Sequence, residues 1–230
     1  MARRARRRAG ARMNVLVQDL AHSYGAERRR AVSVQRLELR SGAQLCLVGR
    51  SGVGKTTLLN VLCGVLVPTS GRVVLGDTEL FALDEARRDA LRARSIGCVF
   101  QTFNLMDGLS ALENLTLAQR FAGVAAAAAR RRARELLDAL GLADKAEAFP
   151  PQLSVGEQQR LAIARAVSKA PGLVLADEPT ASLDDESADA AMDLLLDSCR
   201  ASTLVVVTHD ARVMRRFAMV TQMAELSAVS

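Results

Sequence analysis

The chain has 230 residues, of which 50% are hydrophobic and 24% charged, and its net charge is +6. A chain of this length is typical of one domain and can bury roughly 70% of its unfolded surface. The apolar content excludes extensive disorder, and the low glycine and proline content excludes a collagen-like chain. A membrane-spanning helix is also excluded, because no apolar stretch approaches about 18 residues.

The positive charge is concentrated at the start of the chain. Residues 1–12 hold six of the 31 arginines and lysines and no acid, so the other 25 basic residues match the 25 acidic ones. We interpret residues 1–12 as a disordered Arg-rich arm in front of a domain at residues 13–230. Such an arm contacts RNA, DNA or an anionic membrane, or has no function; alternatively, translation begins at Met13. No apolar segment follows the arm, so it is not a secretory signal.

Predicted strands and helices alternate along the rest of the chain. Apolar runs and apolar–polar alternation predict strands at 14–20, 32–39, 44–48, 72–75, 96–100, 173–176 and 204–207. Helical periodicity predicts helices at 55–65, 84–94, 125–140, 157–168 and 186–198, and residues 102–148 are expected to be largely helical. This alternation predicts a mostly parallel sheet with helices on both faces.

A phosphate-binding loop is predicted between the strand at 44–48 and the helix after it. The segment Gly49–Thr57, GRSGVGKTT, fits G-x-x-x-x-G-K-[ST] in the strand–loop–helix context that this pattern requires. Its glycines allow backbone N–H groups to converge on phosphate oxygens at a helix N-terminus. We expect Lys55 to reach the outer phosphates and the Thr56 hydroxyl to bind Mg²⁺. The loop alone indicates a nucleoside triphosphate, which GTPases, kinases, helicases and transport ATPases all bind.

Two acids and a histidine follow later strands. Asp177 and Glu178 end the strand LVLA, and adjacent side chains there point in different directions, which suits different roles. We expect Asp177 to bind Mg²⁺, directly or through water, and Glu178 to orient or deprotonate an attacking water. His209 follows the strand at 204–207. Because ligands gather at the carboxyl ends of parallel strands, we expect His209 near Glu178, holding the γ-phosphate and the water.

The cysteines and the second histidine suggest no metal site. Cys46, Cys63, Cys98 and Cys199 form no CxxC pair and lie among apolar residues, so we interpret them as buried, reduced thiols. With two histidines in the chain, a His-rich metal cluster is excluded. His22 belongs to no motif, and we predict a surface position for it.

Together these motifs resemble the ATP-binding subunits of ABC transporters, over Met13 to about Val220. LSVGEQQR, from Leu153 to Arg160, is similar to the signature sequence of the family, and Gln101 in VFQTFNL stands where the family has its Q-loop glutamine. Ala181–Asp184 is similar to the D-loop, and Tyr24 stands where an aromatic residue stacks on adenine. The resemblance implies an α/β fold: a phosphate-loop NTPase core with a mostly parallel sheet, an antiparallel β subdomain and a helical subdomain at about 102–160.

The resemblance also implies roles for individual residues. It implies nucleotide binding by Tyr24, Gly49, Arg50, Ser51, Gly52, Val53, Gly54, Lys55, Thr56 and Thr57, and catalysis by Glu178, His209 and Lys55. It implies a Mg²⁺ site at Thr56, Gln101 and Asp177, a D-loop function for Ser182 and Asp184, and a signature, Ser154, Val155, Gly156 and Glu157, that acts on the ATP of a second copy. Val155 departs from the family, where glycine is commonest at this position. The backbone N–H of Val155 is still available, but its branched side chain leaves less room for the nucleotide of the second copy to approach the signature.

The partners are implied by the same resemblance. Two copies would pack head to tail around two ATP molecules, and the helical segment would meet a cytoplasmic helix of a separate membrane permease. The chain would then be peripheral, on the cytoplasmic face of the membrane. VFQTFNLMDGLSALENL and LSVGEQQRLAIARA are most similar to the lipoprotein-releasing, macrolide-exporting and cell-division types. Export, or release of a lipoprotein or lipid, is therefore expected.

Alternative functions remain at this stage. One is an ABC-type ATPase that acts as a mechanical switch in a cell-division-like membrane complex. Another is a nucleic-acid-processing ATPase, but Ser154 follows Lys55 by 99 positions, with neither the long coiled-coil or zinc insertion of DNA-repair relatives nor a CxxC pair. We therefore expect no specific nucleic-acid partner. A GTPase is excluded, because the chain has no Asn-Lys-x-Asp base-recognition motif.

Overall fold

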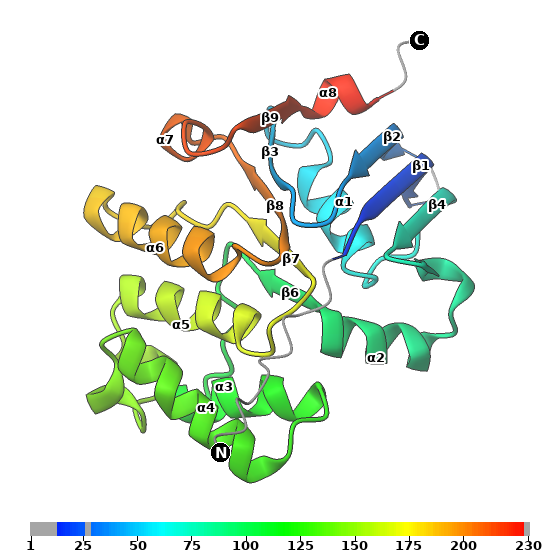
Figure 1. Ribbon diagram of the computed structural model, residues 1–230. Helices are drawn as coiled ribbons and strands as arrows, with labels where there is room; N and C mark the ends of the chain where they lie inside the picture. Colours follow the sequence, from blue (N-terminus) through cyan, green and yellow to red (C-terminus); the bar gives the residue numbers. More distant parts are fainter. Residues whose placement is uncertain (1–12, 26–28, 228–230) are drawn as a thin grey trace, which may run out of the picture.

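Two β-sheets and two groups of helices make up the computed structural model, which describes residues 13–25 and 29–227, without the side chains of 29 and 30 (Figure 1). The predicted arm at 1–12 lies outside these residues. An antiparallel sheet has the order β2-β1-β4-β5, with β1 Val15–Tyr24, β2 Arg29–Leu39, β4 Ser70–Leu75 and β5 Thr78–Glu79. A parallel sheet has the order β6-β7-β8-β3-β9, with β3 Gln44–Val48, β6 Ile96–Val99, β7 Leu173–Asp177, β8 Thr203–Thr208 and β9 Met219–Gln222.

The register of the parallel sheet brings its functional strand ends together. Val48 pairs with Thr208, Asp177 pairs with Val207, and Val99 pairs with Ala176. The segments that follow β3, β6, β7 and β8 therefore leave the sheet at one edge, where parallel α/β folds bind their ligands. These segments carry the phosphate loop, Gln101, Glu178 and His209.

The helices lie on the parallel sheet or form a separate layer below it in Figure 1. The α-helices are α1 Lys55–Leu62, α2 Glu85–Ser95, α3 Ala111–Phe121, α4 Ala126–Ala139, α5 Val155–Val167, α6 Asp185–Ser198, α7 Ala211–Met214 and α8 Met223–Leu226. Three short 3-10 turns occur as well, at Leu80–Ala82, Ala143–Lys145 and Pro150–Gln152. In the part of the chain that the structure describes, no helix is long and apolar enough to cross a membrane.

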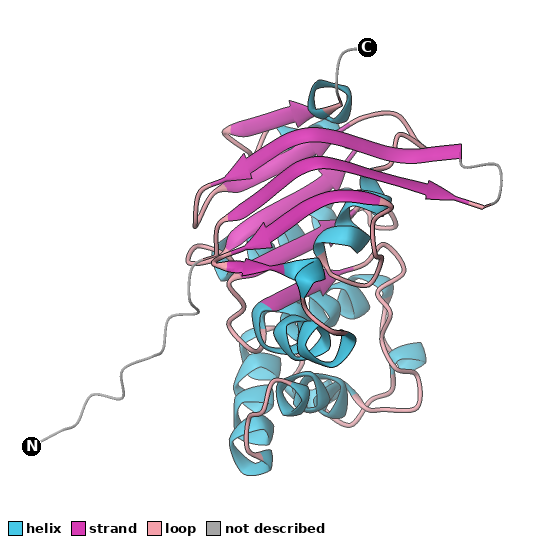
Figure 2. Ribbon diagram, turned by 90° about the vertical axis from the view of Figure 1, so that its right-hand side faces the viewer, coloured by secondary structure: helices cyan, strands magenta, loops and turns pink. Residues whose placement is uncertain are grey.

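Three hydrophobic clusters account for this arrangement. The largest joins the antiparallel sheet, α1 and one face of the parallel sheet, and includes Val17, Leu58 and Leu175. The second packs α5 and α6 on the other face of the parallel sheet. The third lies among α3, α4 and α5, so α5 contributes to two clusters. Figure 2 shows the resulting division, with the strands together and the α3–α4 pair at one end.

The predicted α/β fold class, with a parallel sheet, an antiparallel sheet and helices, is confirmed. Two details of the sequence analysis are wrong. Residues 102–110 form turns and loop rather than helix, because Ser110 caps α3 through the Glu113 N–H. His22 is not a surface residue: it is 8% exposed, on the core-facing side of β1.

Candidate functional site

The phosphate loop connects β3 to α1 through a backbone that requires glycine. Gly54 has φ +97°, and a Cβ there would lie 2.3 Å from the carbonyl oxygen of Ala31. The next residue, Lys55, begins α1 and is buried, and its Nζ donates to the carbonyl oxygens of Gly49 at 2.7 Å and Arg50 at 3.2 Å. The ammonium group therefore lies inside the loop, where it can bind an anion.

The loop forms one wall of a cavity of about 750 Å³ at the edge of the parallel sheet. This volume is within the range of small-molecule and cofactor sites. The lining residues are Tyr24, Ala31, Gly49, Arg50, Ser51, Gly52, Gly54, Lys55, Thr56, Thr57, Gln101, Asp177, Glu178 and His209. Of the residues predicted for nucleotide binding, Val53 does not line the cavity.

Asp177 ends β7 beside the phosphate loop and is buried. Burial raises the pKa of Asp177, as does the charge of Glu178, whereas a hydrogen bond with Thr56 and the charge of Lys55 lower it. A buried carboxylate beside a hydroxyl provides two oxygen donors of the kind that Mg²⁺ prefers. Among the described residues, no group of three or more His, Cys, Asp and Glu side chains is placed to hold a metal ion.

Glu178 points away from Asp177, toward the end of β8. Its Oε1 lies 2.8 Å from His209 Nδ1, and its Oε2 accepts hydrogen bonds from Thr208 Oγ1 at 2.9 Å and from the His209 N–H at 3.3 Å. Glu178 also has φ +46°, a strained conformation for a non-glycine residue, of the kind that is common at functional sites. The structure thus orients this carboxylate with three contacts from a neighbouring strand end.

Tyr24 lies at the end of β1, on the rim of the cavity. Its exposed ring meets the His22 ring edge-on, with centroids 4.7 Å apart and an interplanar angle of 79°. Among the described residues, neither ring nitrogen of His22 has a hydrogen-bond partner. His22 therefore supports the position of Tyr24 by packing, a relation that the sequence analysis missed.

The segment after Gln101 is held by two residues to which the sequence assigned no individual role. Arg165 of α5 donates from Nη2 to the Phe103 carbonyl at 2.7 Å and from Nη1 to the Asn104 carbonyl. Both acceptors have positive φ, +59° and +50°. Asn114 of α3 binds the carbonyls of Met106, Leu109 and Ser110 through its side-chain amide. Neither role has a local sequence signal, because both partners lie in irregular loop.

The predicted signature residues form the N-terminus of α5, outside the cavity. Ser154 Oγ accepts from the Glu157 N–H at 3.3 Å, and Glu157 accepts from the Ser154 N–H at 2.7 Å, which is a capping box. This backbone hydrogen bond lowers the pKa of Glu157. Ser154 is exposed, and the side chain of Val155 is 46% exposed beside it. The positive end of α5 therefore faces outward.

The predicted D-loop lies between the acid pair and α6. Ser182 is exposed, and Asp184 caps α6 by accepting from the Ser187 N–H at 2.9 Å. Gln159 of α5 donates to the Pro179 carbonyl at 2.6 Å and is buried. This hydrogen bond connects the residue two positions before the D-loop to α5, the helix that Ser154 caps.

Comparisons with known proteins agree with this geometry. Residues 32–181 match the family model described as "ABC transporter". An uncharacterised ABC transporter ATP-binding protein of Mycobacterium tuberculosis is 44% identical over 187 residues, which cover 80% of this chain and 75% of the relative. The lipoprotein-releasing system ATP-binding protein LolD of Pseudomonas fluorescens is 41% identical over 211 residues, or 90% of this chain and 93% of the relative.

A solved structure is similar over nearly the same extent. It is the dimeric ATP-binding cassette MJ0796 in a post-hydrolysis state bound to ADP and Pi, with a TM-score of 0.83 and 36% identity. The match covers 90% of this chain and 93% of that chain. The family model covers more than half of the chain, and the relatives exceed 40% identity. The chain belongs to the ABC transporter family, as one of its ATP-binding, ATP-hydrolysing subunits.

Proposed function

We propose that this subunit dimerises around ATP and drives a separate membrane permease that exports a substrate or releases a lipoprotein or lipid. The high identity to a lipoprotein-releasing subunit over 90% of the chain supports this assignment. In this proposal the chain is peripheral, on the cytoplasmic face of the membrane. The homologous cassette that was solved as a dimer with ADP and Pi supports the pairing of two copies.

The outward-facing start of α5 is the observation that carries the proposal. Ser154 offers a hydroxyl and a helix N-terminus, both suited to an anion, yet no residue from 154 to 157 lines the cavity of its own chain. A second copy, packed head to tail, would place this N-terminus against the phosphates of the first. Bound ATP then attracts donors from both copies, and loss of phosphate after hydrolysis lets the two copies separate.

Within one cavity, the residues take complementary roles. Lys55 binds the outer phosphates, Glu178 polarises the attacking water, His209 holds the carboxylate and the γ-phosphate in place, and Tyr24 stacks on the base. Electrostatic stabilisation of the transferred phosphoryl group dominates this chemistry. The oxygen donors of Thr56, Asp177 and Gln101 fit Mg²⁺, which would offset negative charge on the phosphates.

The dimer is tested with Glu178→Gln, which keeps the hydrogen bond to Thr208 but removes the base. We expect this variant to bind ATP, to lose turnover and to sediment as a dimer with excess Mg-ATP. The matched control is Glu178→Gln with Ser154→Arg, which blocks the outward face of α5 without touching the cavity. We expect that double variant to bind ATP as a monomer. Monomeric Glu178→Gln with bound ATP would contradict the pairing of two copies.

A groove beside α3 supports the proposed permease contact. It has a volume of about 520 Å³ and lies between α2, β6, α3 and the end of α5. Apolar side chains such as Phe100, Met106 and Phe121 line it, and Phe121 is 67% exposed. Arg92, Arg165 and Lys169 add positive charge. We propose that an amphipathic cytoplasmic helix of the permease, with acidic residues beside its apolar face, binds in this groove.

The groove is tested by co-purification with the membrane protein encoded in the same operon. We expect Phe121→Asp to abolish co-purification from solubilised membranes and to leave the ATPase activity of the isolated subunit unchanged. The matched control is Ala127→Asp, which adds the same charge at an exposed position of α4 outside the groove. Equal recovery of the permease with both variants would exclude this groove as the contact.

A further inference from the structure

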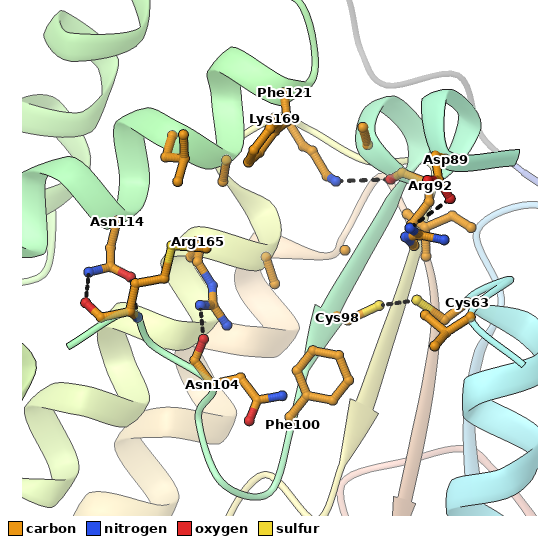
Figure 3. Close-up of a pocket in the computed structure, with 18 residues that line it drawn as sticks. Cys63, Asp89, Arg92, Cys98, Phe100, Asn104, Asn114, Phe121, Arg165 and Lys169 are labelled. Carbon is orange, nitrogen blue, oxygen red and sulfur yellow. Dashed lines mark hydrogen bonds and ion pairs between the residues drawn. The ribbon is translucent and has the colours of Figure 1, made fainter. Parts of the chain in front are cut away.

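Two cysteines that are far apart in the sequence lie next to each other in the fold. Cys63 directly follows α1 as its C-cap residue, Cys98 is in β6, and their sulfur atoms are 2.9 Å apart. Figure 3 shows the two side chains pointing toward each other across the gap between the helix and the strand. Neither the spacing nor the neighbours of the four cysteines in the sequence distinguish this pair from Cys46 and Cys199.

The surroundings of the pair favour one thiolate. The hydrogen bond with Cys98 lowers the pKa of Cys63, and the charges of Arg92 and Lys169 act in the same direction, against the effect of burial. The pKa of Cys98 is raised, first by its hydrogen bond to Cys63 and then by burial. Thiolate is the nucleophilic form of cysteine, so Cys63 is the attacking group of the pair.

Other charged groups around the pair come from α2 and from the turn after α5. Asp89 forms an ion pair with Arg92 at 2.8 Å. Lys169 donates to the Arg92 carbonyl at 3.0 Å, and burial lowers the pKa of Lys169 to about 8, a shift that the two thiols oppose. At neutral pH the local charge is therefore positive, which stabilises a thiolate.

Solvent access separates this pair from the other two cysteines. Cys63 and Cys98 both line the groove beside α3; Cys98 is partly exposed, whereas Cys63 is buried, with 3% of its surface exposed. Cys46 and Cys199 are fully buried, and burial raises the pKa of Cys46 to about 11 and that of Cys199 to about 12. The groove therefore gives a small oxidant a route to the first pair, whereas Cys46 and Cys199 do not line it and serve as internal controls.

We propose that Cys63 and Cys98 are a modification site at which hydrogen peroxide forms a reversible intramolecular disulfide. The Cys63 thiolate attacks a peroxide oxygen, the O–O bond breaks, and the leaving hydroxide takes the proton that the thiol released, to give water. The Cys98 thiol then attacks the sulfenic sulfur, the S–O bond breaks, and a second water leaves. Two thiols lose two electrons and two protons, and one peroxide is reduced to two waters.

The bond would connect two segments that lead into the cavity. α1 begins at Lys55, and β6 ends at Val99, one residue after Cys98 and two residues before Gln101. The disulfide would thus join the helix of the phosphate loop to the strand of the Gln101 segment, at the floor of the groove. The inference rests on this sulfur geometry and not on the proposed permease contact.

The test is a thiol count on the reduced full-length chain after treatment with hydrogen peroxide. We expect the number of titratable thiols, measured in denaturant, to fall from four to two, with dithiothreitol restoring four. Peptide mapping should find Cys63 linked to Cys98 in a monomer. The control Cys199→Ala should still lose two thiols, whereas Cys63→Ser and Cys98→Ser should form no intramolecular disulfide at the same dose.

Three results would overturn the proposal. Four remaining thiols would show that the pair does not react. Oxidation of Cys63 to a sulfinic acid, with Cys98 still reduced, would show that Cys98 does not resolve the first step. A disulfide between two chains, or one that involves Cys46 or Cys199, would assign the chemistry to other residues.

Discussion

Arg165→Ala tests whether the hydrogen bonds from Arg165 fix the segment that follows Gln101. A hydrogen bond to a charged group contributes about 1.5–3 kcal/mol, so the two bonds to Phe103 and Asn104 amount to roughly 4 kcal/mol. When they are lost, the two residues leave left-handed conformations that cost about 1 kcal/mol each. The net loss of stability is then about 2 kcal/mol, which lowers Tm by about 4–8 °C in a chain of this size.

Calorimetry and hydrogen exchange measure this effect. We expect faster exchange at residues 101–105 in Arg165→Ala, and a lower rate of ATP hydrolysis with little change in ATP affinity, because Gln101 loses its position. The control is Arg131→Ala, which removes an exposed ion pair to Glu135 and should change stability by less than about 0.5 kcal/mol. Unchanged Tm and unchanged exchange at 101–105 in Arg165→Ala would refute the reasoning.

Three further changes probe the cavity itself. Lys55→Ala should lose binding of a fluorescent ATP analogue, and normal binding would remove Lys55 from the phosphate site. Gly54→Ala should destabilise the chain by at least about 2 kcal/mol, since its Cβ meets the Ala31 carbonyl; Gly52→Ala, which has a positive φ without a clash, should cost less in the same urea titration. Asp177→Asn should abolish hydrolysis but stabilise the fold at neutral pH. Burial raises the pKa of Asp177 above its ordinary 3.8, so its contribution to stability is present below that value and is lost as pH rises through the native pKa. The stability of Asp177→Asn relative to the parent chain should therefore be greater at pH 7 than at pH 4, and an equal difference at both would contradict the burial effect.

The parts of the site that can be predicted from the sequence are short motifs of contiguous residues at the ends of strands. The phosphate loop, the acid pair and His209 each follow a short apolar strand, and in a parallel sheet such strand ends meet at one edge. The close approach of Glu178 and His209 depends on this rule and on the adjacency of β7 and β8. The order of helices and strands can be predicted as well, because hydrophobic periodicity is a property of neighbouring residues.

The position of His22 shows where local patterns fail. Val15 and Val17 are buried in β1, and then the buried positions shift by one residue, to Leu20 and His22. The shift occurs at Asp19, which has φ +48° and lies where the register of β1 against β4 is irregular. A bulge of this kind exchanges the two faces of a strand. Nothing in the alternation of residues 14–20 indicates this shift, and His22 belongs to no motif, so its burial was not predicted.

Contacts between segments that are distant in the sequence could not be predicted either. Cys63 and Cys98 are 35 residues apart, and Arg165 is 62 residues from Phe103. Each pair forms because segments with separate local signals come together in the fold. Without an observed packing arrangement, a cysteine or an arginine in an apolar stretch has no preferred partner. The two residues that hold the Gln101 segment were therefore missed, although Gln101 itself was predicted.

Helix α5 connects the outward face of the molecule to the segments that follow Glu178 and Gln101. Its N-terminus carries Ser154, its buried Gln159 binds the Pro179 carbonyl just after Glu178, and Arg165 in its last turn holds the segment after Gln101. A packed helix moves as a unit, so a displacement at its N-terminus is transmitted to both loops. This arrangement gives a physical reason why binding of a second copy at Ser154 would change the catalytic geometry around Glu178 and Gln101 together.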